Sequence, residues 1–288
     1  MTDLLKLLRV KHYIKNLFIL IPLFFSGNFL EMNKLVETLL IFVAFCCVAS
    51  AVYILNDYLD IESDKLHEVK KHRPLAAGLI STRQAFITFC ILLFIAVVLI
   101  FFVNSSVFGL ISFYFLLNIA YSFYLKNFPL VDINIIAVGF VVRLFIGAVV
   151  SSIELSQWIV IMTFLLALFL GLAKRRDDVI IFEKTGIKAR SKIEVYTKQF
   201  LDQSLALLGG IVIVAYLMYV TNADTMEQMN SQYLYLNSIF VITGILRYLY
   251  RTSVLNDSSS PTKALYTDRI LQMMILGWLA SFVWVLYF

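Results

Sequence analysis

Long apolar runs separated by short polar connections make up most of the chain. A run of about 20 apolar residues is long enough to cross a bilayer as a helix. The runs are continuously hydrophobic rather than amphipathic, which is typical of helices that contact lipid. Nine runs can be distinguished, at Leu17–Leu30, Leu35–Leu55, Ala85–Val103, Val107–Leu125, Ile133–Val150, Trp158–Leu172, Leu205–Val220, Tyr233–Tyr250 and Ile270–Phe288. We therefore predict an all-α integral membrane bundle of nine transmembrane helices.

The basic residues indicate how this bundle is oriented. All but two of the 24 Lys and Arg residues lie before the first run or in or around the loops after the second, fourth, sixth and eighth runs, the exceptions being Lys34 and Arg143. The positive-inside rule then places the N-terminus and these loops in the cytoplasm. We expect a multi-pass protein of the cell (inner) membrane with its active site on the cytoplasmic side.

Composition and loop lengths narrow the possible functions. A chain with 61% hydrophobic and 15% charged residues has too little polar surface for a soluble domain. The net charge of +5 follows from membrane orientation, so we expect no nucleic-acid partner. A transporter would carry ionisable residues in many spans, whereas only Arg143 lies deep here.

Two long charged loops follow the second and sixth runs and are four runs apart. This placement suggests a single domain over residues 1–288, in which helices 1–4 and 5–8 form a possible pseudo-repeat. We expect the two loops to meet at one cytoplasmic mouth, and a homo-oligomer remains possible.

The first of these loops opens with three aspartates at i, i+3 and i+7, namely Asp57, Asp60 and Asp64. On a helix this spacing places all three carboxylates on one face, where they repel each other. A divalent cation removes that repulsion, and Mg²⁺ suits a site made of carboxylates and substrate phosphates. Asn56 directly before them can orient a ligand. We predict that these four residues are catalytic and that the three aspartates bind Mg²⁺; the alternative is a solvated helix end balanced by lysines.

Basic residues follow the aspartates on the same loop. Lys71 and Arg73 fit a cationic clamp for phosphates, in which Arg makes bidentate contacts and Lys acts as a point charge. The alternative is that they only signal orientation, and Arg73, fixed beside Pro74, is the one for which we favour a binding role.

The stretch from Asn56 to Asp64, continued by "KHRPLAAG", resembles the first aspartate-rich motif of the UbiA superfamily of intramembrane prenyltransferases. The resemblance implies a nine-helix fold that holds magnesium and a diphosphate at a cytoplasmic mouth. The second half departs from the usual pattern, because "LGLAKRRDDVIIFEKTGIKARSKIEVYT" has cations from Lys174 onward where a second D-x-x-x-D motif is expected.

Three stretches resemble the polyprenyl-phosphate phosphoribosyltransferase branch, of the decaprenyl-phosphate type. They are the stretch just quoted, "YSFYLKNFPLVDINIIAVGFVVRLFIGAVV" and "GILRYLYR". The branch implies transfer of 5-phosphoribose from 5-phosphoribosyl 1-diphosphate to a polyprenyl phosphate, with release of diphosphate. The product would be a glycolipid precursor, for example for a cell wall. The alternative is an aromatic, 4-hydroxybenzoate-type polyprenyltransferase of the same fold, in which Asp177 or Asp178 would be essential.

Further substrate-binding residues can be inferred from this resemblance and from the free energy that burying a charge costs. The resemblance implies that Tyr121 and Lys126 contact phosphate or ribose, although interfacial anchoring also explains them. Arg143 lies about three turns after Asp132, and a charge that deep faces a cavity or a partner. We therefore expect Arg143 to bind the lipid phosphate; the alternative is that it forms a purely structural ion pair.

The remaining substrate contacts predicted here are Lys174, Arg175, Asp178 and, by the same resemblance, Tyr196. A plain i, i+4 salt bridge between Lys174 and Asp178 is the alternative. We expect Arg247 and Arg251 to be orientation anchors, and residues 255–269 to form a flexible connection.

Overall fold

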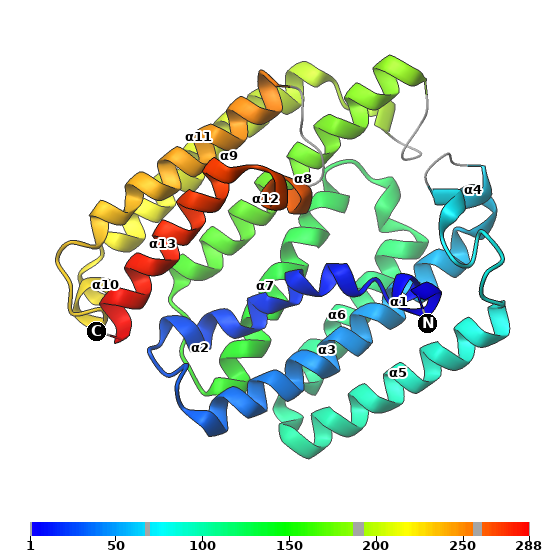
Figure 1. Cartoon of the computed structure of the whole chain (residues 1–288), viewed down its shortest axis with the longest axis horizontal. Helices are drawn as coiled ribbons and strands as arrows, with labels where there is room; N and C mark the ends of the chain where they lie inside the picture. Colours follow the sequence, from blue (N-terminus) through cyan, green and yellow to red (C-terminus); the bar gives the residue numbers. More distant parts are fainter. Residues whose placement is uncertain (1, 67–69, 187–192, 256–260, 288) are drawn as a thin grey trace. The chain divides into compact units, whose positions relative to one another are not determined.

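The computed structural model describes residues 2–66, 70–186, 193–255 and 261–287, and every regular element among them is a helix (Figure 1). The chain divides into two compact units. The first comprises Met1–Lys126 and Val142–Leu155, and the second Asn127–Val141 and Ser156–Phe288. Helix α7, Val131–Ser151, therefore contributes its first residues to the second unit and the rest to the first.

The first unit is built around α3, which packs against α5, α6 and the N-terminal 3₁₀-helix η1. Helix α5 begins at Thr82, after the N-cap residue Ser81. The Ser81 side chain caps the Gln84 amide and the Gln84 side chain caps the Ser81 amide, a capping box that fixes this helix start. The elements of this unit besides α7 are α1 Thr2–Leu7, η1 Val10–Leu20, α2 Ile21–Phe25, α3 Met32–Leu59, α4 Ile61–Lys65, η2 Lys70–His72, α5 Thr82–Val103, η3 Ser105–Val107, α6 Phe108–Phe123 and, except for its last residue, η4 Leu125–Asn127.

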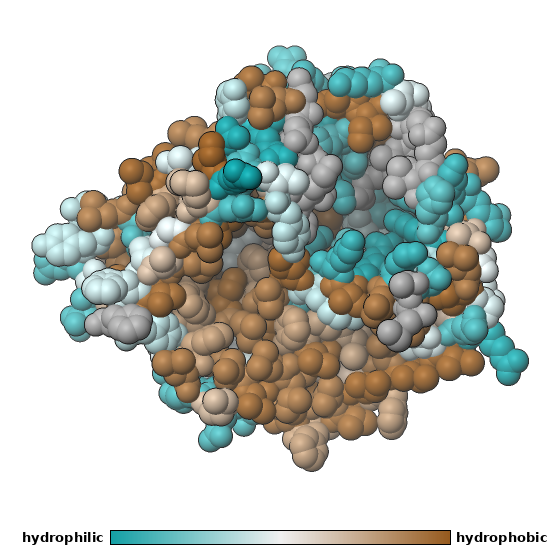
Figure 2. Space-filling view, in the orientation of Figure 1, coloured by the Kyte–Doolittle hydropathy of each residue, from teal (hydrophilic) through white to brown (hydrophobic). Residues whose placement is uncertain are grey.

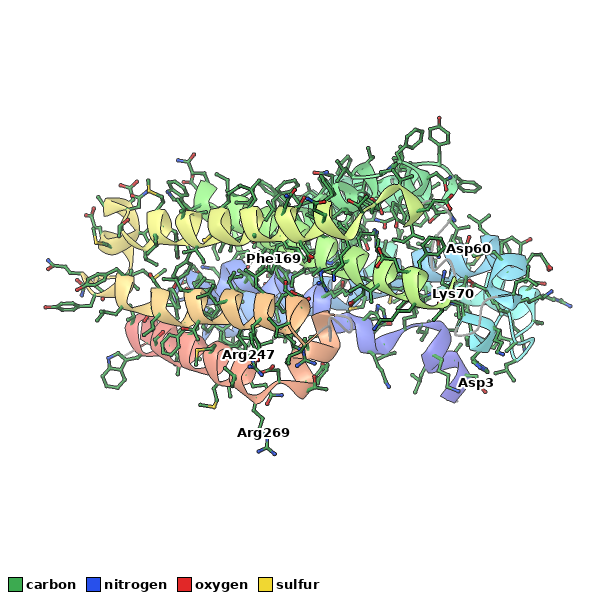
Figure 3. All side chains as sticks on the ribbon, turned by 90° about the horizontal axis from the view of Figure 1, so that it is seen from above. Asp3, Asp60, Lys70, Phe169, Arg247 and Arg269 are labelled. Atoms are coloured by element: carbon green, nitrogen blue, oxygen red, sulfur yellow. The ribbon has the colours of Figure 1, made fainter. Side chains whose placement is uncertain are left out.

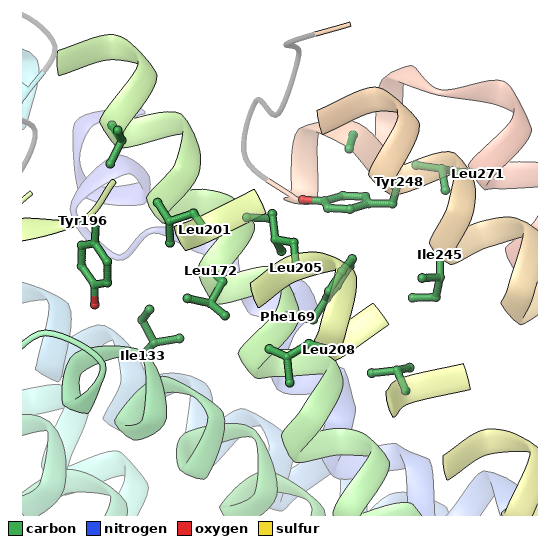
Figure 4. Close-up of a cluster of buried hydrophobic side chains, with 14 of the residues drawn as sticks. Ile133, Phe169, Leu172, Tyr196, Leu201, Leu205, Leu208, Ile245, Tyr248 and Leu271 are labelled. Carbon is green, nitrogen blue, oxygen red and sulfur yellow. The ribbon is translucent and has the colours of Figure 1, made fainter. Parts of the chain in front are cut away.

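The second unit packs α8 on α9, α9 on α11 and α11 on α13. Its core is a set of buried apolar side chains that includes Phe169, Leu205 and Tyr248 (Figure 4). The elements of this unit besides α7 are α8 Gln157–Thr185, η5 Ile193–Val195, α9 Lys198–Val220, α10 Ala223–Gln228, η6 Leu234–Asn237, α11 Ser238–Ser253, α12 Pro261–Thr267 and α13 Arg269–Tyr287.

The helices confirm a multi-pass membrane protein. Within the described residues, seven segments are long and apolar enough to cross a membrane: α3, α5, η3 with α6, α7, α8, α9 and α13. The surface over α5 is hydrophobic, with Phe94, Phe101 and Phe102 exposed (Figure 2). The two other predicted runs form the shorter elements η1 with α2, and η6 with α11, so the count of nine stays a prediction.

The predicted flexible connection near the C-terminus is wrong for residues 261–268, whereas residues 256–260 lie outside the described part. Pro261–Thr267 is helix α12, and Asp268 is buried before α13. The Asp268 carboxylate accepts hydrogen bonds from the amides of Ile270 and Leu271 at 3.0 and 3.1 Å, which caps α13.

The same carboxylate binds the two arginines of α11, one of which is labelled in Figure 3. Arg247 Nε donates to Asp268 Oδ2 at 3.0 Å, and Arg251 Nη1 donates to the same oxygen at 3.2 Å. Both residues are thus parts of a tertiary ion-pair network as well as basic residues near a helix end, which corrects their expected role as simple anchors.

The pKa of Asp268 makes the stability of the fold depend on pH. Burial alone would raise the pKa of Asp268, but the hydrogen bonds from Arg247 and the Leu271 amide, with the charge of Arg247, lower it below 3.8. The pKa of Asp268 is therefore lower in the folded than in the unfolded protein. The ionised carboxylate stabilises the fold fully at pH values above the unfolded-state pKa, and this stabilisation is lost as the pH falls through the folded-state pKa.

We therefore expect Asp268→Asn to lower the Tm at pH 7 and to reduce the loss of Tm between pH 5 and pH 3. Thermal unfolding in detergent across this range measures both. The control is Asp224→Asn, which changes an exposed acid of the same unit and should follow the wild type. A mutant curve parallel to the wild type would contradict the assignment.

Candidate functional site

The aspartate-rich segment begins at the end of α3 but does not continue it as one helix. Helix α3 ends at Leu59, Asp60 adopts a non-helical conformation (φ −97°, ψ 6°), and α4 begins at Ile61. The expected single helical face for all three carboxylates is therefore wrong. The break turns Asp60 to a different partner from Asp57 and Asp64, which separates charges that would repel on one helix.

Asp57 and Asp64 converge on one guanidinium group. Both aspartates are buried, each 2% exposed. Arg73 Nη1 lies 3.1 Å from Asp57 Oδ1 and 2.6 Å from Asp64 Oδ2, so a single nitrogen bridges the two carboxylates. Arg9 also donates to Asp57 Oδ1. Arg73, which was predicted to bind phosphate, here contacts the acids themselves.

Asp60 pairs with Lys126, which lies 66 residues later in η4. The Lys126 Nζ donates to Asp60 Oδ1 at 2.8 Å, and both side chains are about one-quarter exposed. The structure thus brings Lys126 to the aspartate segment. Figure 3 labels Asp60 and Lys70 in this part of the first unit. Lys71 is exposed and Asn56 half-buried here, Tyr121 is half-buried on α6, and His67 lies outside the described residues.

The aspartate carboxylates are chemically suitable ligands for a metal cation, but they are not arranged around a common metal-binding position. Asp57 and Asp64 already hold a positive group between them, which is the arrangement that a divalent cation needs. However, no three Asp, Glu, His or Cys side chains within the described ranges are close enough together to hold a metal ion as they stand. Binding of Mg²⁺ by Asp57, Asp60 and Asp64 would require Arg73 and Lys126 to exchange partners.

Sequence reasoning missed the contribution of the N-terminal segment. Arg9 has a left-handed backbone (φ 51°) and directly precedes η1. Such a conformation costs a non-glycine residue about 1–3 kcal/mol, and its presence next to the buried Asp57 suggests a functional constraint. Arg9 precedes the first apolar run, and the sequence indicates for it only the role of a basic residue that sets membrane orientation.

Arg143 is buried in the first unit, 5% exposed, and is held by neutral groups. Its Nε donates to Asn16 Oδ1 at 3.0 Å, and its Nη2 donates to the Tyr114 hydroxyl at 3.1 Å. The guanidinium also lies over the rings of Phe45 and Tyr114, 4.8 and 4.9 Å from their centroids. These contacts hold Arg143 against η1 and α6.

Gly147 allows η1 to pack directly on α7, one turn after Arg143. A Cβ added to Gly147 would overlap the backbone carbonyl of Ile19, which is three residues after Asn16. Backbone atoms cannot yield as a flexible side chain does, so the two helices would have to separate. The close approach at Gly147 therefore keeps Asn16 against Arg143.

We expect Gly147→Ala to destabilise the protein by about 1–3 kcal/mol through this overlap. The matched control is Gly210→Ala, because an added Cβ there meets nothing within 4 Å and removes a flexible residue from a helix interior. Thermal unfolding in detergent should therefore move in opposite directions for the two variants. Equal shifts would show that the contact between η1 and α7 is loose.

In the second unit, two of the predicted side chains, Arg175 and Tyr196, contact Asp132. Arg175 donates to Asp132 Oδ2 through Nε at 2.9 Å and Nη2 at 2.6 Å, and both side chains are buried. Tyr196 accepts a hydrogen bond from the Leu130 amide at 2.7 Å and donates to Asp132 Oδ1 at 3.4 Å. Burial raises the pKa of Tyr196, so its hydroxyl stays protonated at neutral pH.

Asp178, which was also predicted, lies close to the same network, whereas Arg176 has partners of its own. Asp178 lies 3.6 Å from Arg175, its i, i+3 neighbour. Arg176 is fully buried, binds Asp202 and donates to the Thr252 carbonyl at 2.5 Å. Arg175 and Arg176 thus have partners that sequence spacing did not identify, and the shared mouth of the two loops stays a prediction. Lys188, Arg190 and Lys192 of the second loop lie outside the described residues.

The protein is a multi-pass helical protein. At the end of one helix, buried carboxylates pair with arginine side chains of the kind that bind phosphate, and this combination is typical of a membrane transferase. Residues 19–276 match the UbiA prenyltransferase family, and the chain belongs to that family. Its fold is similar to that of a UbiA homolog from Archaeoglobus fulgidus bound to GPP and Mg²⁺, with a TM-score of 0.71 at 20% identity over 99% of this chain and 100% of the other.

Two relatives are similar over nearly the whole chain. A decaprenyl-phosphate phosphoribosyltransferase of Corynebacterium glutamicum is 28% identical over 99% of this chain and 86% of its own length. The enzyme of the same name from Mycolicibacterium smegmatis is 29% identical over 100% of this chain and 93% of its own.

Proposed function

We propose that this protein transfers 5-phosphoribose from 5-phosphoribosyl 1-diphosphate to a polyprenyl phosphate. The observation that carries the proposal is the convergence of Asp57 and Asp64 on Arg73. The two carboxylates can hold a cation, and the Arg73 guanidinium beside them is suited to binding phosphate. The two relatives named decaprenyl-phosphate phosphoribosyltransferase support this substrate pair.

The donor diphosphate is proposed to bind at the aspartate segment. Asp57, Asp60 and Asp64 would hold Mg²⁺, which when bound supplies Lewis-acid neutralisation of the diphosphate leaving group. Arg73, released from the carboxylates, would make bidentate contacts to phosphate oxygens, and Lys71 and Lys126 would add point charges. Asn56 would orient the donor through its amide.

In the second unit, Arg175 and Lys174 are proposed to contact phosphate. The Asp132 carboxylate holds the Arg175 guanidinium in one orientation, and Tyr196 restrains that carboxylate in turn. A phosphate acceptor is already anionic at neutral pH, so its oxygen can attack the anomeric carbon without a general base. The products are diphosphate and a polyprenyl-phosphoryl phosphoribose.

The wider setting is part of the same proposal. The chain would form one UbiA-like domain of nine spans in the cell membrane, with the N-terminus and the active site on the cytoplasmic side. The abundance of basic residues in the segments assigned to that side supports it.

A donor swap tests the proposal. Purified protein in detergent with Mg²⁺ and undecaprenyl phosphate receives labelled phosphoribosyl diphosphate, and in parallel geranyl diphosphate with 4-hydroxybenzoate. We expect magnesium-dependent label in the lipid phase that is lost in Asp60→Ala. Label only in a prenylated aromatic product would overturn the phosphoribosyl assignment in favour of aromatic prenyl transfer.

A further inference from the structure

The segment Val10–Leu20 adopts an unusual helical form. It is a 3₁₀-helix of 11 residues, whereas such helices rarely exceed three or four residues. With three residues per turn, side chains at i and i+3 lie in one row along the helix. His12 and Lys15 therefore share one row, and Tyr13, Asn16 and Ile19 share the next.

The second row packs against the rest of the first unit. Tyr13 pairs with Ser50 at 2.8 Å, Asn16 Nδ2 donates to Cys46 Sγ at 3.2 Å, and Ile19 is fully buried. Since Asn16 also accepts from Arg143, the position of η1 along α3 and α7 is fixed. The first row is fixed with it.

Lys15 is the distinctive member of the first row. It is half-buried, yet among the residues that the structure describes it forms no hydrogen bond or ion pair. Burial, together with the charges of Arg143 and Arg9, lowers the pKa of Lys15 to about 8. A desolvated ammonium group beside two guanidinium groups is stabilised when an anion binds between them.

The surroundings indicate which kind of anion fits. Lys15 lies two residues before the apolar run Leu17–Leu30, and Leu17 is 45% exposed. An anion bound at Lys15 therefore lies where an attached hydrocarbon chain finds apolar surface. The carboxylates that are proposed to bind the donor diphosphate have their own cations in Arg9 and Arg73.

We propose that Lys15 and Arg143 together bind a phosphate monoester, and that this group is the head of the polyprenyl phosphate acceptor. The inference rests on the proposed function and adds a residue, Lys15, that decides which acceptor is used. The phosphate monoester at position 5 of the donor ribose has the same chemistry, so the test separates the two sources.

The first measurement is binding without turnover. Undecaprenyl phosphate and undecaprenol are titrated into the protein in detergent, for the wild type, Lys15→Met, Lys15→Arg and Lys11→Met. We expect Lys15→Met to weaken binding of the phosphate at least about tenfold, a loss on the scale of one charge-assisted hydrogen bond, and to leave undecaprenol binding unchanged. Lys15→Arg should retain most of the affinity. Lys11, exposed on the same 3₁₀-helix, is the matched control and should behave as the wild type.

Thermal unfolding separates binding from folding. Lys15→Met should raise the Tm of the ligand-free protein, because it removes a desolvated charge that other cations repel. A lysine whose role is structural would lower the Tm when replaced. A lowered Tm in Lys15→Met, or undiminished phosphate binding, would overturn the site.

Steady-state kinetics identify the source of the phosphate. A raised KM for undecaprenyl phosphate with an unchanged KM for phosphoribosyl diphosphate supports the acceptor assignment. A raised KM for the donor alone would overturn it and assign the site to the ribose 5-phosphate. If the protein transfers no phosphoribose but its binding of undecaprenyl phosphate depends on Lys15, the proposed reaction fails while the phosphate site stands.

Discussion

Asp57→Asn is expected to lower kcat/KM for phosphoribosyl transfer at least about a thousandfold, the scale of removing a preorganised charge from a reaction centre. The substitution keeps the shape of the side chain but removes the charge that both Arg9 and Arg73 contact. It also removes one of the two carboxylates that converge on a cation. The measurement is transfer of labelled phosphoribose into lipid, at saturating and at limiting Mg²⁺.

The matched control for this prediction is Glu62→Gln. Glu62 lies two residues before Asp64 on α4, but its side chain is 85% exposed and pairs only with Lys65 at i, i+3 among the contacts that the structure describes. We expect its activity to equal that of the wild type, because exposed ion pairs contribute little. Near-normal transfer by Asp57→Asn, or an equal loss in Glu62→Gln, would show that the convergence at Arg73 has no catalytic role.

Arg175→Met is expected to destabilise the protein by about 3–5 kcal/mol, because it leaves the Asp132 carboxylate buried without its main partner. The two side chains are 1% and 5% exposed. Replacing both charges, in Arg175→Met with Asp132→Leu, should recover most of the lost stability, since apolar pairs of similar volume often replace buried ion pairs. Chemical or thermal unfolding in detergent measures both variants.

Activity then distinguishes a structural arginine from one that contacts phosphate. We expect the double variant to remain at least about tenfold less active although it is folded, because the guanidinium is missing in both variants. Lys184→Met, at an exposed lysine further along α8, is the control and should change neither quantity. Full recovery of activity in the double variant would limit Arg175 to a structural role.

The candidate site was predictable to the extent that its residues are neighbours in sequence. Asp57, Asp60 and Asp64 were recognisable by spacing, and Arg73 by its place nine residues after Asp64. The partner of Asp60 was not predictable, because Lys126 lies 66 residues later in a distant element. Arg9 and Lys15 were overlooked because basic residues before an apolar run are also what membrane orientation requires.

The sequence by itself determined the class of protein and the acidic segment, because a bilayer demands long apolar runs and an asymmetric distribution of charge regardless of how the helices pack. Only the tertiary structure decided which acid or amide each buried or half-buried arginine meets. Arg9 and Asp57 are 48 residues apart, and Arg143 and Asn16 are 127 apart. Such partners are chosen by the packing of helices and by the free energy of burying charge, and local spacing contains no information about either.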